Sequence, residues 1–293
     1  MSGNTRPMTK SLDVPAGINP VDFYRENGFL VVRSLFSQAE VEHLRDYFMA
    51  MVERGGDGWA EGGVHPDDPD PLRRYPRLLQ PHRGDQVAFD YMVDDRIRER
   101  LTSFYDREPL AVQTMVYFKP PGARGQALHQ DQRYLLAEPG TCMAAWLALD
   151  DIDEENGCME IIPGSHGLPM LCPNRTDFTQ SFTGDIVPVP EGLEPIKAIM
   201  KAGDMLFFNG SLIHGSGPNS SSDRFRRIIV GHYIEGVAEK VAEYYFPVYR
   251  FDGSVVSDIE SSPGPGPCGV LVDRDGKQVI EMTGTALSAT SAH

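Results

Sequence analysis

A histidine and a carboxylate stand two residues apart at His129 and Asp131, and a further histidine follows at His214. Side chains at positions i and i+2 of a β-strand point to the same face, so His129 and Asp131 could reach one ion from the inner face of a strand end. Two imidazoles and one carboxylate suit ferrous iron and leave coordination positions open for chemistry. Taken alone, His129 and Asp131 also fit a surface turn, and His214 also fits a histidine of the core. His166 and His232 are rival candidates for the third ligand.

The hydrophobic pattern predicts the elements that would position these residues. Helical spacing and capping residues predict helices over about 19–26, 37–55 and 95–105. Short β-branched and aromatic runs predict strands at 29–32, 110–118, 125–131, 142–150, 157–162, 196–200, 204–209, 212–215 and 226–234. Asp275-Gly276 predicts a terminal hairpin. Eight strands from residue 110 onward suggest a two-sheet antiparallel sandwich with helices against one outer face.

The same pattern predicts how the chain is divided. Residues 1–17 are expected to form a disordered leader, and residues 18–293 a single domain. We expect its core at about 108–235 and a C-terminal extension with the hairpin at about 236–285. Residues 55–90 are rich in Gly, Pro, Asp and Arg and are expected to form a long loop.

Composition narrows the class of partner. The formal net charge of −15 argues against nucleic acid and anionic membranes as partners. It does not identify a substrate, because a solvated acidic surface explains it equally well, and a small-molecule substrate is expected on other grounds. No apolar run reaches the length of a transmembrane helix, and the polar N-terminus does not look like a secretory signal. The four cysteines lack Cys-x-x-Cys spacing and are expected to be reduced thiols in a cytoplasmic protein. The oligomeric state is not predicted.

An ordered series of motifs surrounds the candidate ligands. Besides His129-Gln130-Asp131 it comprises Phe118-Lys119-Pro120-Pro121-Gly122, Trp146, Asn156-Gly157-Cys158, Pro163-Gly164-Ser165-His166, Gly203-Asp204, His214-Gly215-Ser216-Gly217 and Phe225-Arg226-Arg227. From about Pro20 to about Tyr233 this series resembles the phytanoyl-CoA dioxygenase family of Fe(II)- and 2-oxoglutarate-dependent oxygenases. The resemblance implies a mainly β fold with flanking helices, namely a double-stranded β-helix of the jelly-roll, cupin-like kind.

The resemblance also implies roles for individual residues. His129, Asp131 and His214 would bind Fe(II), and Arg226 would hold the distal carboxylate of 2-oxoglutarate, because a guanidinium matches a carboxylate at two points. On a regular strand Arg224 would share the face of Arg226, and Arg227 would point away. Further positions that match residues touching or flanking the cosubstrate are Gln130, Trp146 and Ser216, with Met115 as a weaker candidate.

The expected activity is that of a dioxygenase using Fe(II), 2-oxoglutarate and O2. It would hydroxylate an unactivated C–H bond of a small polar metabolite or natural product and release succinate and CO2. Alternatives are desaturation, epoxidation, ring closure or endoperoxide formation, a fatty acyl-CoA hydroxylase, or a metal-binding jelly-roll protein without redox chemistry. Candidate substrate residues are Gln132 and Tyr134 after the ligand strand, and Arg77, His82 and Arg83 in the long loop. The loop residues could instead pair with nearby aspartates.

Overall fold

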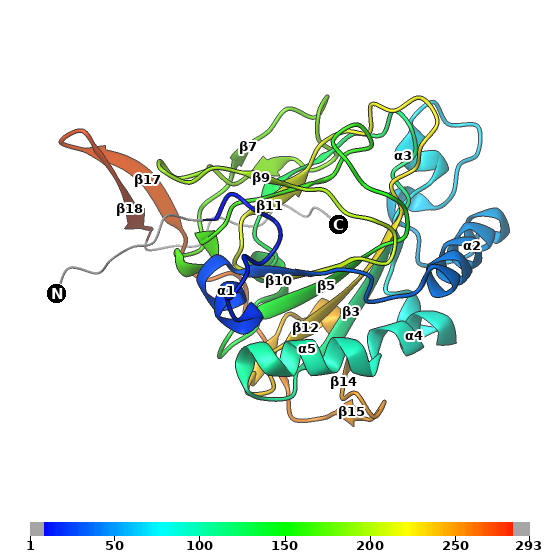
Figure 1. The fold of residues 1–293 in the computed structure, drawn as a ribbon, viewed down its shortest axis with the longest axis horizontal. Coiled ribbons are helices and arrows are strands. Elements are labelled where there is room, and N and C mark those ends of the chain that lie inside the picture. Colours follow the sequence, from blue (N-terminus) through cyan, green and yellow to red (C-terminus); the bar gives the residue numbers. More distant parts are fainter. Residues whose placement is uncertain (1–8, 284–293) are drawn as a thin grey trace.

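Two antiparallel sheets form the body of the computed structural model, which describes residues 9–283 (Figure 1). The large sheet has the order β1 (Phe29–Val32), β10 (Met205–Asn209), β5 (Cys142–Ala148), β12 (Ile228–Ile234), β3 (Leu110–Tyr117), β14 (Val248–Tyr249) and β15 (Val255–Val256), with β2 (Leu78–Leu79) also paired to β3. The small sheet has the order β4 (Gln126–His129), β11 (His214–Ser216), β6 (Met159–Ile161) and β9 (Ile196–Ala198).

The order in which the chain visits the two sheets defines the fold. Strands β3, β5, β10 and β12 belong to the large sheet, and β4, β6, β9 and β11 to the small one. The first and last of these core strands, β3 and β12, are neighbours. This winding of paired strands is a jelly roll, or double-stranded β-helix. The predicted fold class is confirmed.

Burial explains the composition of the central strands. Every residue of β5 and β12 is buried, so both faces of these strands are covered. Strands buried on both faces read as nearly continuous apolar runs, as in Ala144-Ala145-Trp146-Leu147. A polar residue such as His232 is therefore conspicuous in β12.

Helices cover the outer face of the large sheet, as Figure 1 shows for α4 and α5. The long helices are α1 (Pro20–Asn27), α2 (Gln38–Arg54), α4 (Gln86–Met92) and α5 (Asp95–Tyr105), and the short ones α3 (Pro71–Arg74) and α6 (Gln132–Leu135). Ser37 and Glu40 form the predicted capping box of α2. Phe104 of α5 packs edge-on against Phe207 of β10, with 5.8 Å between ring centroids. The three predicted helices agree with α1, α2 and α5.

Residues 55–90 are more regular than predicted. This segment contains α3, α4, strand β2 and the 3-10 turns η1 (Ala60–Gly62) and η2 (Pro81–Arg83). Asp85 caps α4 by accepting a hydrogen bond from Ala88 N at 2.9 Å. The prediction of one long loop was wrong because Gly and Pro mark the turns between elements too short to show a period.

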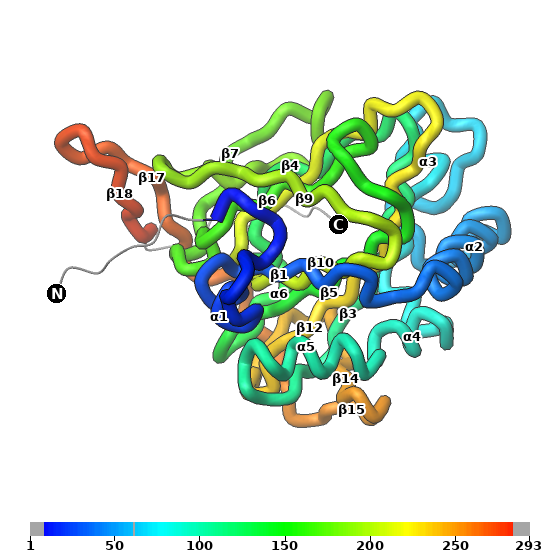
Figure 2. Tube along the Cα trace, in the orientation of Figure 1, coloured from blue at the N-terminus to red at the C-terminus, as the bar shows by residue number. Residues whose placement is uncertain are grey.

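The predicted hairpin is present as β17 (Gly269–Arg274) and β18 (Lys277–Met282), and it projects from the body in Figure 2. Asp275 and Gly276 both have positive φ, as a two-residue hairpin turn of this kind requires. The remaining short pairs are β7 (Asn174–Arg175) with β8 (Asp185–Ile186) and β13 (Lys240–Val241) with β16 (Glu260–Ser261), and the remaining 3-10 turns are η3 (Ser165–Gly167) and η4 (Glu243–Tyr245).

A disulfide between Cys172 and Cys268 lies at the base of the hairpin, with 5.0 Å between the Cα atoms. This corrects the expectation that all four cysteines are reduced, although Cys142 and Cys158 are indeed unpaired. The pair is separated by 96 residues, and local Cys-x-x-Cys spacing carries no information about pairing over that distance.

The predicted leader falls partly outside the described residues, since these begin at Thr9. Residues 9–17 contain neither helix nor strand, yet they lie against the fold, and Asp13 pairs with Arg33 at 2.7 Å. The expectation of a wholly disordered leader therefore does not hold for residues 9–17. Between residues 9 and 283 no helix has the length and apolar character needed to cross a membrane.

Candidate active site

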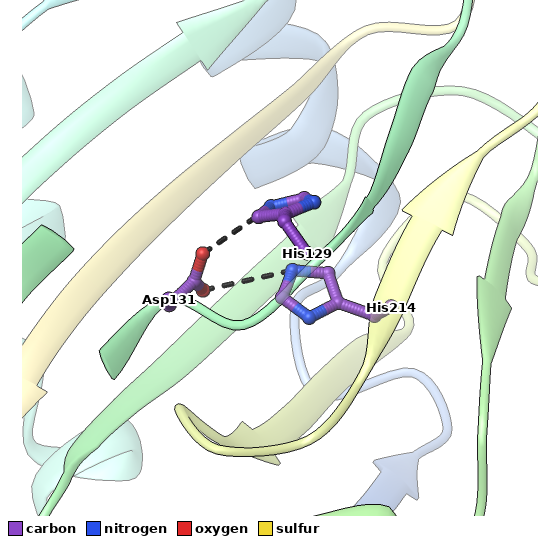
Figure 3. Close-up of side chains that lie close together, drawn as sticks. All are labelled: His129, Asp131 and His214. Atoms are coloured by element: carbon purple, nitrogen blue, oxygen red, sulfur yellow. Dashed lines mark ion pairs between the residues drawn. The ribbon is translucent and has the colours of Figure 1, made fainter. Parts of the chain in front are cut away.

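The three predicted metal ligands lie close together, as Figure 3 shows. In the pairing of β11 with β4, His214 lies directly opposite His129. One ligand atom from each of His129, Asp131 and His214 lies within 4.8 Å of the others. The Asp131 carboxylate faces both rings, with Oδ1 3.3 Å from His129 Nε2 and Oδ2 3.6 Å from His214 Nε2. Strand register thus brings distant parts of the chain to one point.

Asp131 reaches this point differently from the prediction. Strand β4 ends at His129, and Asp131 adopts helical backbone angles (φ −60°, ψ −33°) immediately before α6. The alternation of side chains along a strand therefore does not explain its direction. The chain turns after His129, and this turn brings the carboxylate beside both imidazoles.

Backbone carbonyls orient both imidazoles. His129 Nδ1 lies 2.8 Å from Ala127 O, and His214 Nδ1 lies 2.9 Å from Leu212 O. A carbonyl only accepts, so each Nδ1 carries the proton and donates it. Each Nε2 then keeps a lone pair beside the Asp131 carboxylate. This is the usual arrangement of histidines that bind a metal through Nε2, and the donor set fits a divalent cation.

The electrostatic environment also favours the forms of Asp131 and His214 that bind a metal. Burial opposes ionisation of Asp131, but the neighbouring imidazoles of His214, His129 and His232 outweigh it and hold the pKa of this carboxyl well below its usual range. Burial, assisted by repulsion from His129, lowers the pKa of His214 to about 4. At neutral pH the site therefore presents an ionised carboxylate and a neutral His214, which are the forms that bind metal.

Stability of the metal-free protein is expected to fall as pH drops from about 6.5 to about 4. The folded pKa of His214 is about 4, and so is that of His82, which burial lowers first and Arg83 second. Their unfolded value is 6.5. In this window the unfolded chain binds protons that the folded chain excludes, so the free energy of unfolding decreases by up to about 3 kcal/mol per histidine. Asp131 has a depressed pKa, and its contribution is lost only below about pH 4.

Denaturant unfolding with a chelator at pH 7 and pH 4.5 measures this loss. His82→Gln should flatten the pH dependence without removing it, because His214 still titrates. Equal stability of the wild-type chain at both pH values would contradict the assignment.

A cavity between the two sheets contains the ligand cluster. Across β10, β5, β12 and β3 the register aligns two rows of residues, first Phe208, Ala144, His232 and Gln113, and second Leu206, Trp146, Val230 and Met115. Six of these eight line the cavity, namely Phe208, His232, Gln113, Trp146, Val230 and Met115. The small sheet contributes Gln126, His129, Met159, His214 and Ser216. Polar side chains, among them Gln113, Gln126 and Thr183, line the cavity together with apolar ones such as Met115 and Val230.

Arg226 is a buried cation at this cavity. It is 3 % exposed, it lines the cavity, and within residues 9–283 it forms no ion pair. Its Nε has no hydrogen-bond partner there, and the guanidinium lies 5.5 Å from the Trp146 ring centroid. Burial lowers its pKa to about 10, so the group stays charged at neutral pH. A buried charge without a partner is costly, and it fits an anionic ligand.

The neighbouring arginines are engaged at the surface. Arg224 pairs with Asp153 at 2.8 Å and with Glu155, and Arg227 pairs with Asp150 at 2.8 Å. Strand β12 begins only at Ile228, so the expected strand alternation does not apply to these residues. Of the three arginines, only Arg226 faces the cavity.

Three of the four further cosubstrate candidates line the cavity, and one does not. Trp146, Ser216 and Met115 line the cavity. Gln130 does not: its amide donates to Ser211 O at 2.7 Å and accepts from Leu171 N at 2.9 Å. Gln130 points away from the ligands because it lies between His129 and Asp131, and it ties the ligand segment to neighbouring loops.

Of the five candidate substrate residues, two line the cavity and three do not. Arg77 and Tyr134 line the cavity, and Arg77 stacks on Phe182 with 4.8 Å from Cζ to the ring centroid. The other three have structural contacts elsewhere. Gln132 donates to Ala137 O at 2.7 Å, His82 bonds to Thr114 Oγ1 at 2.9 Å, and Arg83 donates to the carbonyls of Tyr244 and Phe246. None of these three is among the residues that line the cavity, so the structure does not support a substrate role for them.

Sequence reasoning named His232 only as a rival metal ligand, did not single out Gln113, and left the role of Lys119 open. His232 lies beside the ligands, with Nε2 3.2 Å from Asp131 Oδ2, and Gln113 stands opposite it on β3. Lys119 is buried and donates to Ser216 Oγ at 2.9 Å and to Gly217 O, which fixes the turn after His214. A polar residue inside an apolar strand was the available signal for His232 and Gln113.

The family model for phytanoyl-CoA dioxygenase (PhyH) matches residues 24–228. The peroxisomal phytanoyl-CoA dioxygenase of Bos taurus is 30 % identical over 230 residues, which cover 73 % of this chain and 67 % of that protein. The Homo sapiens enzyme is 28 % identical, with 72 % and 66 % covered. The chain thus matches about two thirds of the length of these relatives.

Solved structures share the fold. The epimerase SnoN, in complex with Fe3+, alpha ketoglutarate and nogalamycin RO, is 20 % identical with a TM-score of 0.61, and 88 % of this chain and 95 % of that chain are covered. The carbocyclase SnoK from nogalamycin biosynthesis is also 20 % identical with a TM-score of 0.61, at 84 % and 94 % coverage. EvdO2 from Micromonospora carbonacea var. aurantiaca, complexed with 2-oxoglutarate, is 20 % identical with a TM-score of 0.57, at 85 % and 97 % coverage.

Proposed function

Because the chain belongs to the phytanoyl-CoA dioxygenase family, we propose that it hydroxylates an unactivated C–H bond of a small polar metabolite or natural product, with release of succinate and CO2. By membership the chain is a non-haem dioxygenase that uses Fe(II) and 2-oxoglutarate. The proposal concerns the reaction, the substrate and the residues that serve them.

The residues of the cavity would have distinct roles in this reaction. His129, Asp131 and His214 would hold Fe(II) through the two Nε2 atoms and the carboxylate. Bound iron would supply the reaction with O2 that makes a C–H bond reactive. Arg226 would bind the distal carboxylate of 2-oxoglutarate, and Ser216 and Trp146 flank that position. Apolar side chains such as Met115 and Val230 would exclude water from the reacting atoms.

One observation carries this proposal: a buried guanidinium without an acidic partner among the described residues shares a cavity with a ligand set suited to ferrous iron. A jelly-roll protein that only bound a metal would have no use for Arg226, and an isomerising or hydrolytic metal enzyme would not need it either. A 2-oxoglutarate enzyme needs both features at once.

The choice of substrate rests on the charge of the cavity. Among residues 9–283, Arg77 and Arg226 are the only Lys or Arg side chains that line the cavity, and we assign Arg226 to the cosubstrate. A coenzyme A thioester carries several phosphate charges, and this cavity offers no cluster of cations for them. The acyl-CoA alternative is therefore less favoured. SnoN in complex with nogalamycin RO and SnoK from nogalamycin biosynthesis agree with the choice of a natural product. Desaturation, epoxidation, ring closure and endoperoxide formation stay as alternative outcomes, which product analysis separates.

Anaerobic addition of Fe(II) and 2-oxoglutarate is expected to produce a weak visible absorption band, because 2-oxoglutarate chelates iron through its ketoacid end. Exposure to O2 should then release succinate. The variant Arg224→Gln should still give the band and release succinate, because Arg224 lies two residues from Arg226 but pairs at the surface. A wild-type protein that gives neither band nor succinate would contradict the proposal.

The cellular location is a separate proposal. We expected the cytoplasm in part because the cysteines seemed reduced, and the Cys172–Cys268 disulfide removes that argument, since structural disulfides are rare in reducing compartments. Alkylation of free thiols in freshly lysed cells, followed by mass spectrometry, would show whether the pair is oxidised where the protein works.

A further inference from the structure

Besides Arg226 Nε, two buried nitrogens in the cavity have no protein partner among the described residues. His232 on β12 and Gln113 on β3 stand directly opposite each other in the antiparallel register. The two residues are 4 % and 2 % exposed, and both line the cavity. His232 Nδ1 and Gln113 Nε2 form no hydrogen bond within residues 9–283. Because buried polar groups are nearly always hydrogen-bonded, this pair points to a ligand group.

The contact with Asp131 fixes the role of each nitrogen. His232 Nε2 lies 3.2 Å from Asp131 Oδ2, and an ionised carboxylate can only accept. In the tautomer that this contact selects, Nε2 carries the proton and donates it, and Nδ1 is the acceptor. Gln113 Nε2 is a donor. Opposed residues in an antiparallel pair have Cβ atoms about 4.5–5.5 Å apart, so one acceptor and one donor stand side by side.

The pair lies away from the position proposed for 2-oxoglutarate. Arg226 precedes the first residue of β12, whereas His232 is the fifth residue of that strand. The row containing Val230 and Met115 separates His232 and Gln113 from the Arg226 end. Asp131 adjoins His232, so the pair is next to the metal ligands but on the side remote from Arg226. A diacid that extends from Arg226 to the metal leaves this side to the prime substrate.

We infer that Gln113 and His232 together bind a hydroxyl group of the prime substrate, so that the substrate is a neutral alcohol at the position next to the metal site. This inference rests on the proposed function. A hydroxyl accepts from Gln113 Nε2 and donates to His232 Nδ1 with a single oxygen. A ketone or thioester carbonyl only accepts, and an ammonium only donates. A carboxylate would lie close to the negative charge of Asp131 and would leave Nδ1 without a donor.

Binding of four probes that share one ring tests the inference. The probes are cyclohexanol, cyclohexyl methyl ether, cyclohexanecarboxylate and cyclohexanecarboxamide, added to protein loaded with Mn(II) and 2-oxoglutarate. Paramagnetic relaxation of the probe protons reports which compounds bind near the metal. We expect cyclohexanol to bind about five- to tenfold more tightly than the ether, as one or two hydrogen bonds would give. Gln113→Leu should abolish this preference while leaving ether binding in place, and Gln86→Leu, at an exposed glutamine of α4, should keep it.

Each other result overturns the inference. These results are equal binding of alcohol and ether, a preference for the carboxylate or the carboxamide, a preference for the alcohol that survives in Gln113→Leu, or no binding of any probe. Equal binding would also indicate that the pair serves only ordered water. If the wild-type protein gives no absorption band with Fe(II) and 2-oxoglutarate, the proposed function itself fails. If the band forms but the alcohol is not preferred, only this inference fails. The comparison of probes in the wild-type chain does not depend on how any variant folds.

Discussion

Replacing Asp131 by alanine is expected to abolish succinate release, with a loss of at least about 1,000-fold. Asp131 is the single carboxylate of the cluster and faces both imidazoles. Its removal leaves two imidazoles and no negative charge to balance a divalent cation. Since changes in groups that merely support metal ligands cost 10–100-fold in metal affinity, loss of the only anionic ligand should cost more. Fe(II) or Mn(II) titration and the succinate assay measure the two losses.

Asp177→Asn is the matched control, because Asp177 is an exposed carboxylate that bonds Thr179. It should retain the metal affinity and the activity of the wild-type chain. A folded Asp131→Ala protein with undiminished metal affinity would show that the cation binds elsewhere. Unfolding measured with a chelator separates a missing ligand from a protein that has lost its fold.

The candidate metal ligands could be predicted because they lie in short, local sequence patterns. His129-Gln130-Asp131 and the His214 turn are local patterns, and their order within a longer series of motifs distinguishes them from chance. Even so, the reason given for Asp131 was wrong, since a helical turn and not strand alternation directs its carboxylate. Residue types at a fixed spacing indicated the chemistry of the site, but they did not indicate the backbone conformation that positions Asp131.

Features that depend on pairing between distant segments could not be predicted. The opposition of Gln113 and His232 follows from the register of β3 with β12, which includes an irregularity between His232 and Tyr233. Nothing in either strand alone specifies that register. The Cys172–Cys268 disulfide is likewise a contact between a loop and the base of a hairpin 96 residues away. Local patterns predict the helices and strands, but only the assembled sheets show which side chains contact each other.

Replacing Arg226 by glutamine is expected to raise the KM for 2-oxoglutarate by about 100-fold. The guanidinium is buried and would pair with the distal carboxylate away from water, where loss of one partner of such a pair costs about 2–5 kcal/mol. Arg226→Lys should give an intermediate value, because an ammonium is a point charge and cannot match a carboxylate at two points. Succinate release as a function of 2-oxoglutarate concentration measures the change, and Arg224→Gln should leave the KM unaltered.

The stability of the ligand-free protein provides an independent check on the same substitution. A structural arginine would stabilise the fold, so its loss would lower the free energy of unfolding. Arg226 has no ion-pair partner among residues 9–283, so burying its charge costs free energy, and the glutamine variant should be as stable as the wild-type chain or more so. Addition of 2-oxoglutarate with Mn(II) should then raise the Tm of the wild-type protein much more than that of the variant. A variant that is destabilised without ligand, yet shows the full rise in Tm on adding 2-oxoglutarate, would assign Arg226 to the fold and leave the cosubstrate without its cation.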